Sequence, residues 1–263
     1  MTVTRQLINA IGSESTKLSW RSPLWYAIVP AAVGIPIVLN GAIAVAAQMN
    51  KFNGGGGMDT NNAAYWIIIF STFILMTGPV TSFSGEFGNR TVEIVFTIAP
   101  RRWLLPIAKL VVFGTVAAGA SALTVFAILW GFPHIFPDVW GRVDLFSGTG
   151  VRLWLGIPIL TVLVCALGLG LSVLIPRPSL VIILVLLWKF GVETFVGFVP
   201  GDVGLILQKF SPFKNAELGV GQMSSFDSVF GGPTGSLLYF AVLAVAIFAL
   251  GLIRLTRADV RSG

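Results

Sequence analysis

The chain has 263 residues, of which 55% are hydrophobic and 11% charged, with a formal net charge of +6 and a mean hydropathy of +0.88. Soluble domains contain about 25% charged residues, so this composition excludes an ordinary water-soluble enzyme or binding module. The positive charge indicates contact with anionic lipid rather than with nucleic acid, because no basic surface with interleaved aromatic residues accompanies it.

Residues 3–20 are expected to form an amphipathic helix on the membrane surface. At 100° per residue, one arc of this helix is apolar and the other is polar. The apolar arc contains Val3, Leu7, Ile8, Ala10, Ile11 and Leu18, and the polar arc contains Arg5, Gln6, Asn9, Ser13 and Lys17. Glu14 falls inside the apolar arc, which favours contact with protein over contact with lipid. The alternative is a carboxylate that only extends to the headgroups.

Six long apolar blocks follow, at residues 24–47, 63–83, 104–131, 151–175, 180–199 and 233–253. Crossing the hydrocarbon core as a helix takes about 20 apolar residues. A closed β-barrel would alternate apolar and polar residues, and these blocks do not. The first block lies too far from the start to resemble a cleaved signal peptide and is expected to be retained. The predicted fold class is therefore all-α, a single membrane domain with six transmembrane helices.

The loop 84–103, between the second and third blocks, contains the most informative polar pattern. Glu86, Arg90 and Glu93 are spaced four and three residues apart, so they would line one face of a helix. Apolar side chains, including Phe96, would form the opposite face. Such a helix can dock into a groove on a partner protein. An ordinary charged loop with one helical turn is the alternative.

Lys189 and Glu193 are four residues apart near the middle of the fifth block, and hence on one face. A lone charge at that depth costs about 3 kcal/mol, whereas a pair that neutralises itself costs less. We expect an ion pair that faces protein, either a paired subunit or a central path. Carriers and channels place such residues in their pathways, so a self-contained secondary transporter or channel is an alternative. The absence of a clear internal repeat opposes it.

Residues suited to catalysis are sparse. Cys165 is the single cysteine, interpreted as a small buried hydrophobe, and His134 has no second histidine near it in an outer loop. The sequence has no paired carboxylates at one depth and no phosphate-binding GxxxxGK[ST] motif, and the glycine run 54–57 lacks the lysine. We therefore expect no enzymatic activity, no metal site and no cofactor in this chain.

The distribution of lysine and arginine predicts the orientation. With the N-terminus inside, eleven of the 17 basic residues lie in cytoplasmic segments, five lie outside and Lys189 lies within a span. Cytoplasmic loops carry the excess of positive charge. Both termini are therefore expected to face the cytoplasm of a cell that carries the chain in its plasma membrane.

Four stretches of the chain match one family in order. Residues 14–25 (ESTKLSWRSPLW) are similar to the pattern E-x-T-K-L-x-x-x-R-S-x-x-W. Residues 85–91 (GEFGNRT), 99–102 (APRR) and 108–109 (AK) resemble E-[YF]-x-x-x-T…[TA]-P-x-R…A-K. Residues 211–216 (SPFKNA) and 257–260 (RADV) resemble the family's later segments. The family is that of the membrane subunits of ABC-2 type ABC transporters, especially the compact actinobacterial form.

The resemblance implies a permease that exports a compound and hydrolyses nothing itself. A coupling helix in 84–103 would contact a separate ATPase, which binds ATP and Mg²⁺, through Glu86, Phe87, Arg90, Glu93 and Phe96. Two permease subunits, identical or homologous, would pair around the path. The outer segment 201–232 would dip toward the membrane with short helices near 203–210 and 215–218.

Two further points qualify this expectation. Many relatives have glycine where this chain has Arg90, which favours continued helix over a tight turn. The spans contain few polar groups, which favours a hydrophobic or amphipathic cargo. A membrane sensor or immunity protein that transports nothing is a third interpretation.

Overall fold

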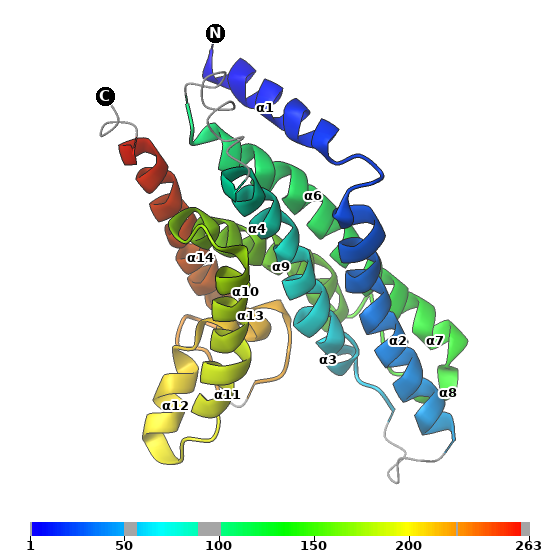
Figure 1. The fold of residues 1–263 in the computed structure, drawn as a ribbon. Helices are drawn as coiled ribbons and strands as arrows, with labels where there is room; N and C mark the ends of the chain where they lie inside the picture. The colour runs from blue at the N-terminus through cyan, green and yellow to red at the C-terminus, as the bar shows by residue number, and fades with distance from the viewer. Residues whose placement is uncertain (1, 50–56, 89–100, 225, 259–263) are drawn as a thin grey trace.

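A computed structural model describes residues 2–49, 57–88, 101–224 and 226–258, and these residues form helices and no strand. Figure 1 shows long helices packed side by side. Six of the helices in the described part of the chain are long and apolar enough to cross a membrane: Leu24–Gln48, Thr60–Glu86, Leu104–Ile135, Gly148–Leu174, Pro178–Val196 and Pro233–Arg257. The predicted fold, an all-α multi-pass membrane protein, is confirmed.

Most of these spans are built from several helical pieces. The first joins η1 (Leu24–Ile28) to α2 (Val29–Gln48), and the second joins α3 (Thr60–Ala63), η2 (Ile67–Ser71) and α4 (Thr72–Gly88). The third joins α6 (Leu104–Phe126), η3 (Ala127–Gly131) and α7 (Phe132–Ile135), and the fifth joins α10 (Pro178–Leu186), η4 (Leu187–Val192) and α11 (Glu193–Val196). The fourth is α9 (Gly148–Leu174), and the sixth is α14 (Pro233–Ala258). The segments η1 to η4 are π-helical turns, which locally widen the helix.

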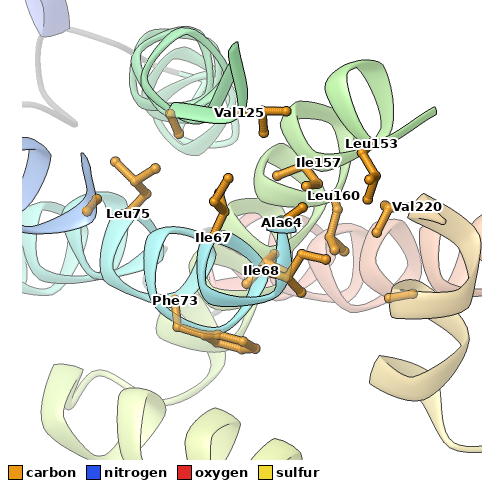
Figure 2. Close-up of a cluster of buried hydrophobic side chains, with 14 of the residues drawn as sticks. Ala64, Ile67, Ile68, Phe73, Leu75, Val125, Leu153, Ile157, Leu160 and Val220 are labelled. Carbon is orange, nitrogen blue, oxygen red and sulfur yellow. The ribbon is translucent and has the colours of Figure 1, made fainter. Parts of the chain in front are cut away.

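The second and fourth spans form the centre of the bundle. In each, 67% of the most apolar window is buried, against 22% in the first and fifth spans and 28% in the sixth. Glycine allows the close approach: a Cβ on Gly168 would lie 2.6 Å from Met76, and one on Gly170 would lie 2.6 Å from the Phe248 backbone. Figure 2 shows Ile67, Ile157 and their neighbours packed in this core. The outer spans thus leave apolar faces for lipid.

The two ends of the bundle differ. Helix α1 (Val3–Lys17) and the C-terminal end of α14 lie at one end, called here the α1 side. Helices α3, α8 (Pro137–Trp140) and α12 (Gly201–Lys209) lie at the other, called the α12 side (Figure 1). Helix α1 ends three residues before the predicted limit at residue 20, and a short turn leads to Pro23, the N-cap of η1.

Two short helices occupy the segment between the fifth and sixth spans, as the resemblance implied, but their bounds differ. They are α12 and α13 (Pro212–Val220), against the expected 203–210 and 215–218. Pro212 stands at the first position of α13, where its missing N–H costs nothing. Helix α13 packs against α14 and α9, so it belongs to the bundle.

Candidate functional site

A buried lysine forms the centre of a charge cluster on the α1 side. Lys109, in the first turns of α6, has no exposed surface. Its Nζ donates to Glu14 Oε2 at 2.6 Å, to Glu86 Oε1 at 2.8 Å and to Ser82 Oγ at 2.9 Å. These three bonds use all three donors of the ammonium group. The ammonium group needs these partners, because a buried ion without one lowers the stability of the fold by on the order of 3–5 kcal/mol.

A second lysine closes the cluster from the surface. Lys17 Nζ donates to Glu14 Oε1 at 2.6 Å and to Glu86 Oε1 at 2.8 Å, and its side chain is 43% exposed. Burial lowers the pKa of Lys17, but the hydrogen bonds and charges of the two carboxylates outweigh it and raise the pKa above its ordinary value. The charge cluster, defined as Glu14, Lys17, Ser82, Glu86 and Lys109, therefore joins two cations to two anions.

The local structure explains how Glu14 reaches this position. Leu7, Ala10, Ile11, Glu14 and Leu18 follow helical spacing, and all are at least partly buried, whereas Val3 and Ile8 are 39% and 62% exposed. The apolar arc of α1 thus divides between a protein-facing and a surface-facing part. Glu14 lies on the protein-facing part against α6, with 2% of its side chain exposed.

The structure describes some of the residues predicted to contact an ATPase and not others. Glu86 is 14% exposed, and its described ion pairs are with Lys17 and Lys109 of the same chain. Phe87 lies in the last turn of α4, although its side chain is outside the described part. Arg90, Glu93 and Phe96 are also outside the described residues, as is most of the predicted coupling loop.

A second cluster lies where α13 meets the fifth span. Glu193 is 1% exposed and accepts three hydrogen bonds: from the backbone N–H of Phe213 at 2.9 Å, from that of Lys214 at 2.8 Å and from Trp188 Nε1 at 3.0 Å. The first N–H groups of a helix have no partner within the helix, so the carboxylate caps α13. Lys189, 8% exposed, forms an ion pair with Glu217 of α13.

This arrangement corrects the predicted pairing of Lys189 with Glu193. Both side chains are buried against protein, but each has a partner on α13 rather than the other. The physical reason is the position of α13, whose N-terminal N–H groups and Glu217 carboxylate lie against the fifth span. Glu217 lies 28 positions after Lys189, so spacing along the chain gives no sign that the two residues pair.

Other contacts fix α13 in place. Asn215 is fully buried, donates to the carbonyls of Lys209 and Ser211 at 2.8 and 2.9 Å, and accepts from Ser236 at 2.9 Å. Arg152 of α9 donates to the Gly219 carbonyl at 3.0 Å. Helix α13 is therefore bound to the fourth, fifth and sixth spans.

The remaining candidates for chemistry lie apart. Cys165 is buried in α9, and His134 is exposed, with its Nδ1 2.7 Å from the Trp130 carbonyl oxygen. Within the described residues, no group of three or more His, Cys, Asp or Glu side chains could hold a metal ion. The two clusters join helices together.

Comparisons with known proteins identify no relative: no family model, no curated protein and no solved structure matches this chain.

Proposed function

We propose that the chain is the permease subunit of an ABC-2 type ABC transporter. The observation that carries the proposal is the composition of the charge cluster. Glu14 and Lys17 come from the first family-like stretch, Glu86 from the second and Lys109 from its continuation, and Lys109 lies 95 positions after Glu14. The N–O distances among these four residues are 2.6–2.8 Å. Charged residues from separate stretches of one family pattern thus meet at one place.

The cluster suggests how force could pass between a cytoplasmic partner and the spans. It joins α1 to the last turns of α4 and the first turns of α6, the two helices that flank residues 89–100. Separating these helices would leave buried charges without their ion-pair partners, which costs several kcal/mol, on the order of 3–5. A force applied to residues 89–100 would therefore move α1, α4 and α6 together. In this proposal the ATPase contacts Phe87 in the last turn of α4 and Arg90, Glu93 and Phe96 in the residues that follow, and Glu86 keeps the end of α4 bonded to Lys17 of α1 and Lys109 of α6.

The proposed division of work is the one that the family resemblance implies. The ATPase would bind ATP and Mg²⁺ and close on ATP binding, and this chain, with a second permease subunit, would provide the path and the coupling surface. Only 11% of the residues are charged, which supports export of a hydrophobic or amphipathic compound. The α1 side, where α1 and the C-terminal end of α14 lie, would face the cytoplasm.

A self-contained carrier is the second candidate, supported by the buried charges Lys189 and Glu193. In a carrier these groups would exchange partners with an ion or a proton during transport. Their contacts with the backbone N–H groups and Glu217 of α13 instead support a role in holding α13. We therefore prefer the permease.

The test is ATP hydrolysis by the chain reconstituted with a candidate partner, namely a phosphate-loop ATPase encoded by a neighbouring gene. Phe96→Ala and Arg90→Ala are expected to lower cargo-stimulated hydrolysis while leaving membrane insertion unchanged, because large side chains buried at an interface dominate its energy. Asp138→Ala, at an exposed position of α8 on the α12 side, is the control and should hydrolyse ATP at the parental rate. A chain that transports without any ATPase would refute the proposal.

The orientation has its own test in intact cells, in a Cys165→Ser background that removes the buried thiol. A membrane-impermeant thiol reagent should label cysteine introduced at Asn53 and should not label cysteine introduced at Ser262. External labelling at Ser262 would reverse the orientation and place the proposed coupling loop outside.

A further inference from the structure

A pocket of about 240 Å³ lies beside the charge cluster on the α1 side. It is bounded by α1, by the turn that follows it, and by η1, α4 and α6. Its lining residues are Glu14, Lys17, Leu18, Ser22, Pro23, Leu24, Ile28, Gly78, Thr81, Ser82 and Phe113. The pocket has room for several atoms of a ligand and is half open to the outside.

One wall of the pocket is polar and includes charged groups fixed in place. Glu14 is 2% exposed and bonded to both lysines of the cluster, so its position is set. Lys17 uses two of its three ammonium donors on Glu14 and Glu86, which leaves one donor for a ligand. Ser22 Oγ accepts from the Leu24 backbone N–H at 3.3 Å, and its own hydroxyl proton is available to donate.

A second wall of the pocket is apolar. Leu24, Ile28 and Phe113 line it where the first, second and third spans meet. Gly78 brings α4 close to Phe113, since a Cβ there would lie 3.1 Å from the Phe113 ring. A small water-soluble anion would leave this wall in contact with water. A ligand with a hydrocarbon chain would cover it.

The turn that bounds the pocket contains Trp20 and is followed by Trp25, at the start of the first span. Trp20 is 87% exposed, its ring centroid lies 5.8 Å from that of Trp25, and Trp25 Nε1 donates to the Leu18 carbonyl at 3.2 Å. Tryptophan is enriched at the boundary between hydrocarbon and headgroups. The first span begins at Leu24, immediately after this turn. We infer from these positions that the polar wall lies at headgroup depth and the apolar wall lies toward the acyl chains.

We propose that this pocket binds one phospholipid from the leaflet on the α1 side. The phosphate accepts a hydrogen bond from Lys17 Nζ and one from the Ser22 hydroxyl, and the upper part of one acyl chain lies along Leu24, Ile28 and Phe113. A phosphate fits better than an amine, because the available groups at Lys17 and Ser22 are donors. The bound lipid would join α1 to the first span, which the charge cluster does not reach. This inference holds whether or not the chain is a permease.

The experiment uses the full-length chain in phosphatidylcholine nanodiscs that contain a phosphatidylglycerol with a photoactivatable diazirine near the top of one acyl chain. After irradiation, mass spectrometry measures the fraction of protein labelled and locates the modified residues. We expect labels on the η1 and α6 segments that line the pocket. A diazirine diacylglycerol, which has the chains and lacks the phosphate, should label those segments at least about tenfold less, given the strength of charge-assisted hydrogen bonds.

Two variants and one matched control make the result specific. Thr81, exposed at the pocket, donates its hydroxyl to the Thr77 carbonyl at 2.7 Å, and Thr115, exposed on α6, donates to the Val111 carbonyl at the same distance. Thr81→Trp should fill the pocket and abolish the pocket labels, whereas Thr115→Trp should leave them at the parental level. Lys17→Gln removes the cation while Lys109 still neutralises one carboxylate, and should weaken labelling by about tenfold.

Three results would overturn the proposal. Parental labelling in Thr81→Trp would place the lipid elsewhere. Equal labelling by diacylglycerol would mean that no phosphate is recognised. Stronger labelling in Lys17→Gln would mean that the carboxylates, and hence a cationic headgroup, determine binding.

Discussion

Replacing the buried Lys109 tests the charge cluster most directly. Lys109→Met is nearly the same size but leaves the carboxylates of Glu14 and Glu86 without their buried cation. Glu14 is 2% exposed and Glu86 14% exposed, so water cannot replace the lost contacts. Breaking a buried pair costs on the order of 3–5 kcal/mol. Lys17→Met removes a partner that is 43% exposed, for which the cost is about 1 kcal/mol or less.

The chain contains its own reporter for this measurement. Cys165 is fully buried, so a dye that fluoresces on reacting with a thiol detects unfolding of the detergent-solubilised protein. At roughly 2–4 °C per kcal/mol, Lys109→Met should lower the midpoint by roughly 6–20 °C, and Lys17→Met by no more than about 4 °C. Changing Glu14 and Glu86 to glutamine as well should restore most of the loss, because the one charge then left without a partner is that of Lys17, whose side chain is 43% exposed. A Lys109→Met protein that melts within about 2 °C of the parent would refute the reasoning.

Two further predictions concern α13. Lys189→Met or Glu217→Gln alone should each destabilise the protein by on the order of 3 kcal/mol in the same thiol assay. The double variant should recover much of that loss, because both charges are then gone. Purely additive losses would show that the two residues do not act as a pair. Gly219→Ala should loosen α13 from α14 and lower the melting midpoint, since its Cβ would lie 2.6 Å from Leu237 Cβ. Gly119→Ala is the control, because a Cβ there would have no atom within 4 Å. Equal melting midpoints for the two variants would contradict the packing.

The sequence by itself determined the features that depend on short stretches of chain. Each span is recognisable because the hydrocarbon core demands a long apolar helix whose backbone bonds are satisfied internally, whatever its neighbours are. Helix α1 is recognisable by the helical period of its apolar residues, and Glu14 in its apolar arc already favoured contact with protein over contact with lipid. The span ends were less accurate. The third span extends four residues beyond the predicted end at 131, because π-helical and α-helical turns continue through Phe132 and Pro133 to Ile135.

Tertiary structure alone decided which charges meet. At 100° per residue, Lys189 and Glu193 share a face, and local spacing therefore predicted that they pair. The packing of α13 against the fifth span supplied better partners: unbonded N–H groups for Glu193 and a carboxylate for Lys189. Likewise, nothing local links Glu14 to Lys109, 95 residues away. A buried ion takes the partner that the packed helices bring within hydrogen-bonding distance, and that distance depends on the whole bundle rather than on spacing along the chain.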